Sequence, residues 1–211
     1  MIKVAIVDDH QIVIDGLRLL LKSRKNIRIT AEANSAEEML RLLDAHPADV
    51  LLTDIMMPGM TGYELSLEIR KNKTSKIKIL ALSMSEDGAL ITKMIEEARV
   101  DGYIPKAAGS QELLKAIELL ANGEKYFSEK ITAQYDAYKK MQSENETFNL
   151  TARELEIINC IIQHLSNKAI AEKLFISERT VETHRKNIYR KTNTKGEAAL
   201  IKFVKDHNIH S

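Results

Sequence analysis

The sequence predicts two domains, an α/β domain with a parallel sheet and a smaller all-α domain after it. Two observations carry this prediction. Short apolar segments alternate with amphipathic segments through the first 122 residues, whereas no convincing strand follows Leu150. Strands that alternate with helices favour a parallel sheet that helices cover on both faces. A length of 211 residues is compatible with two small domains.

The first domain, residues 1–122, is expected to contain five strands and five helices. The strands are predicted at residues 2–7, 27–32, 49–53, 77–82 and 102–104. The helices are predicted at residues 11–24, 36–45, 61–71, 86–98 and 110–121. A capping box of Ser35 and Glu38 is predicted at the start of the second helix. Five strand–helix units favour a flavodoxin-like order in a five-stranded parallel sheet.

The segment 123–147 is predicted to be a linker that contains a short helix. Ile131, Tyr135 and Tyr138 have the spacing of one amphipathic helix face. The polar residues 143–147 that follow are expected to form the linker itself. A short linker makes the first domain a candidate to cover part of the second in the resting state.

The second domain, residues 148–211, is predicted to be all helix. Thr151 and Glu154 form a second capping box, which is expected to open a helix that runs to about His164. Further helices are predicted at residues 167–174, 178–192 and 195–207, with Ser177 as an N-cap.

The composition excludes several classes of protein. No apolar run approaches the roughly 20 residues that a membrane-spanning helix needs. A strand is predicted within two residues of Met1, so we expect no signal peptide. The single cysteine, Cys160, lies in an apolar stretch and is expected to be a buried, inert thiol. These features favour a protein of the reducing cytoplasm with no membrane partner.

Charge is distributed unevenly along the chain. Residues 1–122 carry 16 Lys and Arg against 18 Asp and Glu, whereas residues 150–211 carry 11 against 7. The basic C-terminal third therefore favours a polyanionic partner for that part of the chain, although a modest lysine surplus is also typical of an ordinary solvated surface.

Polar residues follow four of the predicted strands. Asp8 and Asp9 come after the first strand, and Asp54, Ser83 and Lys106 come after the third, fourth and fifth. Ligands of open parallel sheets bind at the edge where these strand ends meet. Three carboxylates would repel one another there unless a cation joined them, and oxygen ligands favour Mg²⁺.

This arrangement fits phosphoryl transfer to a carboxylate. Asp54 is the candidate nucleophile. The Mg²⁺ ion is expected on Asp9, Asp54 and the main-chain carbonyl of Met56, with Asp8 acting partly through water. Lys106 is expected to pair with a phosphate oxygen as a point charge.

Two further side chains are predicted to respond to the new phosphoryl group. The hydroxyl of Ser83 can turn to bind it, and Tyr103 can swing inward to fill the space that this movement leaves. A change of order driven by a new anion is a known mode of switching.

Each of these residues alone also has an ordinary structural explanation. Aspartate at a strand end often forms a turn, a lysine there is usually solvated, and a tyrosine near a sheet edge usually packs half-buried. Only their joint placement at one sheet edge favours a functional site.

Two other classes of protein are disfavoured. A phosphatase of the haloacid-dehalogenase type needs a second acid two residues after its nucleophile, where this chain has Met56. A dinucleotide-binding Rossmann domain needs a glycine-rich turn where this chain has Asp8 and Asp9, which would repel a pyrophosphate.

Four motifs give the first domain its resemblance to the receiver domain of two-component response regulators. They are Val7-Asp8-Asp9-His10, the run from Thr53 to Gly62, Ala81-Leu82-Ser83, and Gly102-Tyr103-Ile104-Pro105-Lys106. The resemblance implies Asp54 as phosphoacceptor, a metal site at Asp8 and Asp9, a switch pair of Ser83 and Tyr103, Lys106 as phosphate partner, and a histidine kinase as donor. It also implies a cis bond between Lys106 and Ala107, which is costlier here because no proline follows Lys106. His10 is interpreted as an ordinary helix-start residue.

The segment from Leu165 to Lys191 has the pattern of a helix-turn-helix. Ala169, Ile170 and Leu174 are expected to pack inward from its first helix, and Val181 and Ile188 from its second. The opposite face of the second helix is polar and basic, and consists of Arg179, Glu182, Thr183, Lys186 and Arg190. Such a helix fits the major groove of DNA, although a charged, solvated face of a small helical bundle is the alternative explanation.

Specific contacts can be assigned to this pattern. Lys186 could read guanine, Glu182 could accept from cytosine, and the methyl group of Thr183 could touch thymine. The helix N-terminus at Ser177 offers backbone donors to an anion. Phosphate contacts, which position the protein without reading bases, are expected from Lys168, Thr180, His184 and Lys191.

Three stretches give the second domain its resemblance to the LuxR-type helix-turn-helix. They are residues 150–156, residues 165–168 and the run from Ile176 to Ile188. Together with the receiver domain, the chain resembles a NarL/FixJ-type response regulator. The resemblance implies double-stranded DNA as a partner, with paired half-sites bound by a homodimer when the protein is phosphorylated. The last helix is the expected dimer face, through Ala198, Ala199, Ile201, Phe203 and Val204, although Ala198 and Ile201 could equally well only close the core of the domain.

Two other functions share part of this pattern. A constitutive DNA-binding regulator with a receiver that is never phosphorylated would keep the second domain, but the complete set of acids, hydroxyl and lysine disfavours it. A stand-alone phosphotransfer component is disfavoured by the helix-turn-helix. The sequence therefore predicts a transcription regulator that is switched by phosphorylation and performs no conventional enzyme turnover.

Overall fold

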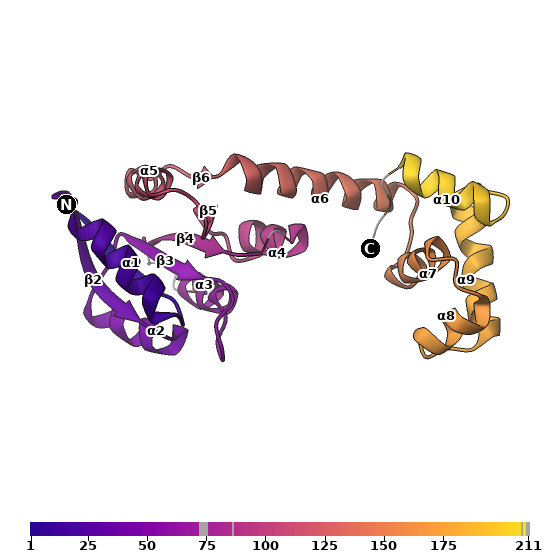
Figure 1. Ribbon diagram of the computed structural model, residues 1–211, viewed down its shortest axis with the longest axis horizontal. Coiled ribbons are helices and arrows are strands. Elements are labelled where there is room, and N and C mark those ends of the chain that lie inside the picture. The colour runs from indigo at the N-terminus through magenta and orange to yellow at the C-terminus, as the bar shows by residue number, and fades with distance from the viewer. Residues whose placement is uncertain (72–75, 86, 208, 210–211) are drawn as a thin grey trace. The chain divides into compact units, whose positions relative to one another are not determined.

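The computed structural model describes residues 1–71, 76–85, 87–207 and 209. The chain forms two compact units, Met1–Asp136 and Ala137–Ser211, which are described separately below. The division falls inside one helix, α6 (Glu129–Thr147) (Figure 1).

The first unit is built on one parallel sheet. Its strand order is β2-β1-β3-β4-β5-β6, and every neighbouring pair is parallel. The strands are β1 (Ile2–Val7), β2 (Ile27–Ala33), β3 (Val50–Asp54), β4 (Lys78–Ser83), β5 (Gly102–Pro105) and β6 (Tyr126–Phe127). The prediction of a parallel α/β sheet is confirmed.

The predicted number of five strands is wrong, because β6 adds a sixth. This strand has two residues, too few to show the alternating pattern that identifies a strand in a sequence. Its pairing partner decides its structure, since Gly102 and Tyr103 of β5 lie opposite Tyr126 and Phe127. The amide of Ser128 continues the ladder by donating to the carbonyl oxygen of Tyr103 at 3.2 Å.

Helices cover both faces of the sheet, and each face has its own apolar cluster. Val4, Ile6 and Leu52 point to the face covered by α1 (Gln11–Lys22) and α5 (Ser110–Ala121). Ala5 and Leu51 point to the other face, as the period of two along a strand requires. That second face is covered by α2 (Ala36–Ala45), α3 (Gly62–Lys71) and α4 (Gly88–Thr92), which continues as a π-helical turn, Lys93–Glu97.

Local signals set most helix boundaries at the predicted places. The hydroxyl of Ser35 accepts from the Glu38 amide at 3.3 Å, as predicted, but the Glu38 carboxylate returns the bond to the amide of Asn34 instead of Ser35. The predicted helix 86–98 begins later, at Gly88, with Asp87 as its N-cap, and its residue 86 lies outside the described residues. Every peptide bond among the described residues is trans, so the expected cis bond at Lys106–Ala107 is wrong.

Helix α6 differs most from the prediction. It runs from Glu129 to Thr147, so the segment 143–147 that was predicted to be a linker is helical. Its first turn is anchored to the first unit, because Ile131 is buried and the Tyr135 hydroxyl donates to Glu96 at 2.8 Å. Polarity alone therefore does not indicate the absence of a helix at 143–147.

The second unit consists of α7 (Ala152–Ile162), α8 (Asn167–Lys173), α9 (Glu178–Lys191) and α10 (Glu197–Asp206), with the last part of α6. The predicted all-α fold is confirmed. The capping box of Thr151 and Glu154 is present in full. Val181 and Ile188 are fully buried, as predicted, and Cys160 is a buried free thiol.

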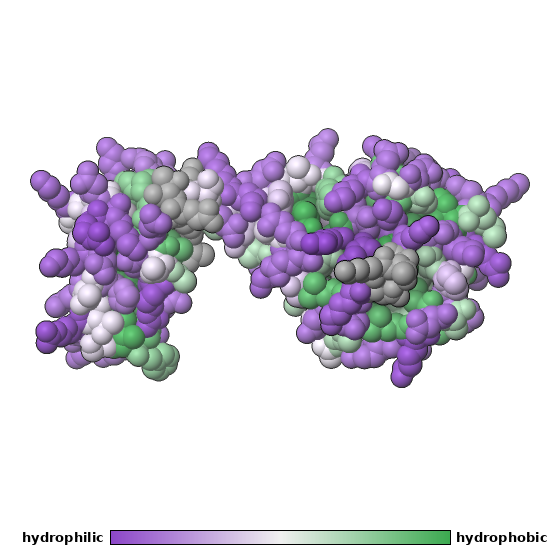
Figure 2. Space-filling view, turned by 180° about the vertical axis from the view of Figure 1, so that it is seen from behind, coloured by the Kyte–Doolittle hydropathy of each residue, from purple (hydrophilic) through white to green (hydrophobic). Residues whose placement is uncertain are grey.

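On the face of the chain drawn in Figure 2, hydrophilic residues predominate, and hydrophobic residues show in smaller patches between them. Within the described residues, no helix combines the length and the apolar character that crossing a membrane requires.

Candidate functional site

Four strands bring polar side chains to one edge of the sheet. The register sets Val7 beside Thr53, Asp54 beside Leu82, and Ser83 beside Pro105, so these four strands end at a similar level. Asp8 follows β1 directly, while Asp54 and Ser83 are the last residues of β3 and β4. Lys106 follows β5, and its amide donates to the carbonyl oxygen of Ser83 at 2.8 Å.

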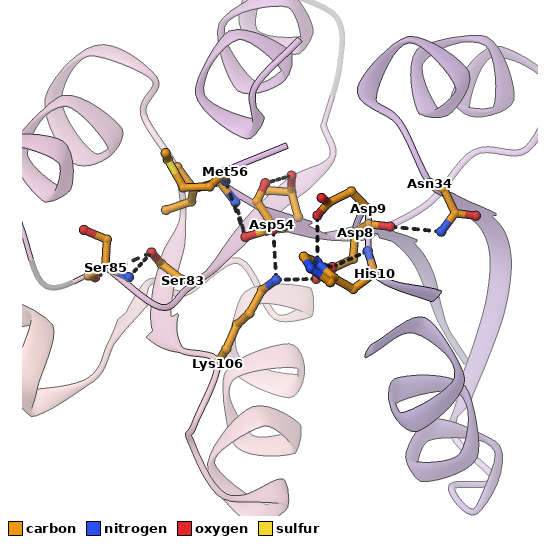
Figure 3. A network of polar contacts seen from close by, with 11 residues as sticks. Asp8, Asp9, His10, Asn34, Asp54, Met56, Ser83, Ser85 and Lys106 are labelled. Atoms are coloured by element: carbon orange, nitrogen blue, oxygen red, sulfur yellow. Dashed lines mark hydrogen bonds and ion pairs between the residues drawn. The ribbon is translucent and has the colours of Figure 1, made fainter. Parts of the chain in front are cut away.

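Lys106 lies between two buried carboxylates. Its Nζ is 2.9 Å from Asp54 Oδ2 and 2.7 Å from Asp8 Oδ2, and only 13% of its side chain is exposed (Figure 3). Burial acts to lower the pKa of Lys106, but its contacts with Asp54 and Asp8 outweigh burial and raise the pKa above its ordinary value. The ammonium is therefore a fixed positive charge at the centre of an acidic site.

The second oxygen of Asp54 is held by the main chain. Oδ1 accepts from the Ile55 amide at 2.7 Å and lies 3.4 Å from the Met56 amide. These bonds fix the orientation of a carboxylate whose residue is 95% buried. Met56, whose amide lies near this oxygen, is 64% exposed.

The acidic residues are arranged as a cation site. Asp8, Asp9, His10 and Asp54 each place a possible ligand atom within 4.8 Å of the others. The buried Asp8 Oδ2 makes no hydrogen bond apart from its ion pair with Lys106, so it keeps acceptor capacity that an ion can use. The oxygen-rich donor set fits a hard cation such as Mg²⁺.

His10 lies closer to this cluster than the sequence indicated. It is the N-cap of α1, as its interpretation as a helix-start residue predicted, but its ring makes no capping bond. Instead, Nδ1 lies 2.9 Å from Asp9 Oδ1 and 3.4 Å from Asp8 Oδ1. The position directly after the two acids was the available signal for this contact.

Ser83 and Tyr103 lie on the other side of Asp54 from Asp8 and Asp9. Ser83 is buried, and its Oγ accepts from the Ser85 amide at 2.9 Å (Figure 3). The ring of Tyr103 is fully buried among the cluster that includes Ile91 and Met94, and its hydroxyl has no hydrogen-bond partner among the described residues. Burial raises the pKa of Tyr103, and the nearby Ser83 opposes this rise. The ring is thus already inside the domain in this structure.

In the second unit, the predicted reading face of α9 is open to solvent. Arg179, Glu182, Thr183, Lys186 and Arg190 are all exposed. The hydroxyl of Ser177 accepts from the Thr180 amide at 3.1 Å and caps the helix, while Thr183 Oγ1 donates to the Arg179 carbonyl oxygen at 2.9 Å. Lys168, on α8, is exposed as well.

Two of the residues predicted to contact DNA phosphates, Lys191 and His184, are partly buried within the unit. Lys191 Nζ lies 2.6 Å from the buried Glu154 carboxylate and 2.6 Å from the Asn149 carbonyl oxygen. This lysine therefore holds the start of α7 to the end of α9. His184 is half-buried, and its Nδ1 has no hydrogen-bond partner within the part of the chain that the structure describes.

The last helix divides between core and surface. Val204 is buried, and Phe203 packs edge-on against Phe148 with ring centroids 4.8 Å apart. Ala198 and Ala199 are exposed, and Ile201 is half-buried. Of the five residues predicted for a dimer face, two therefore serve the core of this unit.

Both parts of the chain match models of known families. Residues 4–118 match the response regulator receiver domain, and residues 148–204 match the bacterial regulatory proteins of the luxR family. The protein belongs to the two-component response regulators of the NarL/FixJ type.

Relatives of this response regulator match along its whole length. The transcriptional regulatory protein MctR of Rhizobium johnstonii is 34% identical over 210 residues, which are 100% of this chain and 96% of the relative. The nitrate/nitrite response regulator protein NarP of Escherichia coli is 35% identical over 204 residues, covering 96% and 94%. The structure of RcsB from Salmonella enterica serovar Typhimurium bound to promoter rprA shares the fold, with a TM-score of 0.63, 24% identity, and coverage of 97% and 98%.

Proposed function

We propose that this response regulator is switched by phosphorylation of Asp54 and that its output is DNA binding as a dimer. The observation that carries the proposal is the position of Lys106, whose ammonium lies 2.9 Å from Asp54 in a group of three carboxylates. A structural ion pair needs one acid, whereas phosphoryl transfer needs a nucleophile, a cation site and a fixed positive charge.

The proposed donor is a phosphohistidine of a histidine kinase. An oxygen of the Asp54 carboxylate attacks the phosphorus, a new P–O bond forms as the P–N bond breaks, and the imidazole of the donor leaves. Lys106 pairs with an oxygen of the transferred group and leaves its present position beside Asp54 Oδ2. The buried surroundings strengthen this pairing, because solvent screens it little.

Asp8, Asp9 and Asp54 would hold Mg²⁺, with the main-chain carbonyl of Met56 as the remaining proposed protein ligand. When bound, the ion neutralises charge on the transferring phosphoryl oxygens. Asp9 and Asp8 follow β1, so the sheet edge itself sets their distance from the nucleophile.

Ser83 and Tyr103 are the proposed switch pair. The Ser83 hydroxyl can exchange its bond with the Ser85 amide for one to the phosphoryl group. Tyr103 is already buried, so the proposed response is a change in what its free hydroxyl and ring contact, rather than an inward swing.

The proposed output surface is the exposed face of α9. Lys186, Glu182 and Thr183 are the proposed base contacts, while Lys168 and the capped helix start at Ser177 and Thr180 contact phosphates. Arg179 and Arg190 extend the basic face, and His184 remains a phosphate contact in this proposal. Lys191 is left out because it is bonded inside the unit. Dimerisation raises the effective concentration of the second reading helix at a paired half-site.

Intact mass after incubation with Mg²⁺ and acetyl phosphate tests the switch. Wild type is expected to gain one phosphoryl group, and Asp54→Asn none. Asp206→Asn, which removes an exposed carboxylate of the second unit, is the matched control and is expected to behave as wild type. A gain in Asp54→Asn would contradict the assignment of the acceptor, and no gain in wild type with a cognate kinase would favour a constitutive DNA-binding regulator.

A further inference from the structure

The turn between α8 and α9 contains a residue that the turn itself does not favour. The Ile176 amide donates to the Ala171 carbonyl oxygen at 3.0 Å, and the Phe175 amide donates to the Glu172 carbonyl oxygen at 3.3 Å. This pair of bonds is a Schellman motif, in which the residue after the helix cap adopts the left-handed conformation. Phe175 occupies that position, with a φ of 54°.

Glycine is the usual residue at this position, and asparagine is the next choice, because a bulky side chain crowds its own backbone there. Two other helices of this chain follow the rule, whereas Arg99 and His164, with φ of 51° and 57°, are further exceptions after helical segments. α5 is followed by Gly123, with a φ of 91°, and α9 by Asn193, with a φ of 51°. The local geometry of the α8–α9 turn therefore gives no reason for a phenylalanine.

Packing within the unit gives no reason either. Phe175 is 94% exposed, the most exposed of the large apolar residues in the described chain. The apolar contact that a Schellman motif usually includes is available to Ile176, which packs against the core of the unit. A residue that is both unfavourable in its turn and unburied points to a contact with another molecule.

The position of Phe175 indicates what that molecule is. It lies two residues before Ser177, the N-cap of the reading helix, and lines a surface hollow whose charged residues are Lys168, Glu172 and Glu178. The exposed charged residues on α8 and the first turn of α9 are Lys168, Glu172, Lys173, Glu178 and Arg179, so cations outnumber carboxylates. The chemistry of such a mixed surface matches the sugar–phosphate backbone, which offers both anionic oxygens and the apolar C–H face of deoxyribose.

We propose that Phe175 is a DNA-contacting residue that packs its ring against a deoxyribose at the rim of the major groove. This proposal rests on the proposed function of α9 as the reading helix and adds an apolar, sequence-independent contact to it. Such a contact contributes affinity by removing apolar surface from water and releases no counterion.

Phe175→Asn in the full chain tests the proposal. Asparagine tolerates the left-handed conformation, so the variant is expected to unfold at the same urea concentration as wild type or a higher one. Its affinity for duplex DNA, titrated by fluorescence anisotropy, is expected to fall about tenfold on both a selected operator and an unrelated duplex. The slope of log affinity against log salt concentration is expected to stay unchanged, whereas Lys168→Ala is expected to reduce the slope by about one.

His164→Asn is the matched control. His164 holds the same left-handed position after α7, with a φ of 57°, and 76% of its side chain is exposed. This variant is expected to bind DNA as wild type does, because the α7 turn does not precede the reading helix.

A fluorescence measurement provides a second test that does not depend on affinity. The chain contains no tryptophan, so Phe175→Trp introduces a single tryptophan, whose emission can be excited selectively over that of the tyrosines. Its emission is expected to change when duplex DNA is added, whereas the emission of His164→Trp is expected to stay constant.

The outcomes separate this proposal from the proposed function. If wild type binds DNA and Lys186→Ala weakens it, but Phe175→Asn binds as wild type, the Phe175 contact is overturned and the reading helix stands. If wild type binds no duplex from a random pool, the proposed function itself fails. If Phe175→Asn abolishes self-association without DNA, the ring serves a contact between two copies and the DNA proposal is overturned.

Discussion

Two buried carboxylates share the ammonium of Lys106. Its Nζ is within 3 Å of both Asp8 and Asp54, whose side chains are 1% and 6% exposed. Removing two buried charges from water is costly unless each is compensated. The lysine provides that compensation in this structure.

Removing this ammonium is expected to destabilise the first unit. Lys106→Ala leaves Asp8 and Asp54 buried and unpaired, which we expect to lower the free energy of unfolding by about 3 kcal/mol. Lys71→Ala is the control, since the Lys71 side chain is 71% exposed and its pair with Glu68 contributes less than about 0.5 kcal/mol. Urea unfolding followed by circular dichroism measures both, and equal losses would contradict the role given to Lys106.

Magnesium is expected to stabilise the same site. An ion that binds only the folded state raises the unfolding temperature by mass action. Millimolar Mg²⁺ should therefore raise the unfolding temperature of wild type and leave that of Asp9→Asn nearly unchanged. Removal of the ion by a chelator should reverse the rise. A rise of the same size in Asp9→Asn would place the ion elsewhere.

At the scale of elements, capping and edge pairing decide where structure begins. β6 holds the segment before α6 against β5, because Ser128 donates to the carbonyl oxygen of Tyr103. The hydroxyl of Ser128 also accepts from the Ile131 amide at 3.4 Å. The start of α6 is thus bonded to the strand that carries the proposed switch tyrosine.

The start of α7 depends on one buried carboxylate. Glu154 is 2% exposed and accepts from the Thr151 amide at 2.8 Å and from Lys191 at 2.6 Å. Burial acts to raise the pKa of Glu154, but the bonds from Lys191 and Thr151 outweigh it and hold the pKa below the ordinary value of 4.5. Because the folded state lowers this pKa, the charged carboxylate stabilises the fold fully above pH 4.5, and this contribution is lost as pH falls through the folded-state pKa.

Glu154→Gln is therefore expected to have a pH-dependent effect. Above pH 4.5 it should lower the free energy of unfolding of residues 148–211 by about 2 kcal/mol, and the difference from wild type should shrink as pH falls further. Glu156→Gln, on the same helix but with a side chain 49% exposed, is expected to cost less than about 0.5 kcal/mol at every pH. A difference for Glu154→Gln that stays constant down to pH 2 would contradict this account.

At the scale of the whole molecule, the two units have separate cores. Among the described residues, the apolar cluster of the second unit draws on residues between Phe148 and Ile209. The two clusters of the first unit draw on residues between Ile2 and Tyr135. Within this described part of the chain, neither core includes a side chain from the other unit.

The fragment 148–211 is accordingly expected to fold alone. It should show helical circular dichroism and one cooperative thermal transition, because its core is complete. Comparing its DNA affinity with that of the unphosphorylated full chain then tests whether the receiver covers the reading helix. Tighter binding by the fragment would support such masking, and equal binding would count against it. A fragment without cooperative unfolding would contradict the independence of the two cores.

The sequence by itself determined the fold of each part and most site positions. Alternating apolar runs gave the parallel sheet, because strands buried on both faces must be apolar throughout. The polar residues after those runs, such as Asp54 and Lys106, then had to meet at one edge. Helical spacing likewise placed Val181 and Ile188 inward and Lys186 outward. These features depend on short segments of the chain, so local sequence patterns predict them.

Only the tertiary structure decided the features that depend on partners distant in sequence. β6 exists because β5 offers an unpaired edge, and its two residues show no pattern of their own. Lys191 is bonded inside the unit because folding brings Glu154 to it from 37 residues away. Tyr103 is buried because helices close over its side of the sheet. The left-handed conformation of Phe175 and its 94% exposure are likewise properties of the folded turn, not of the sequence pattern. In each case the outcome depends on which contacts the folded chain makes or leaves unmade, and spacing along the sequence does not encode this.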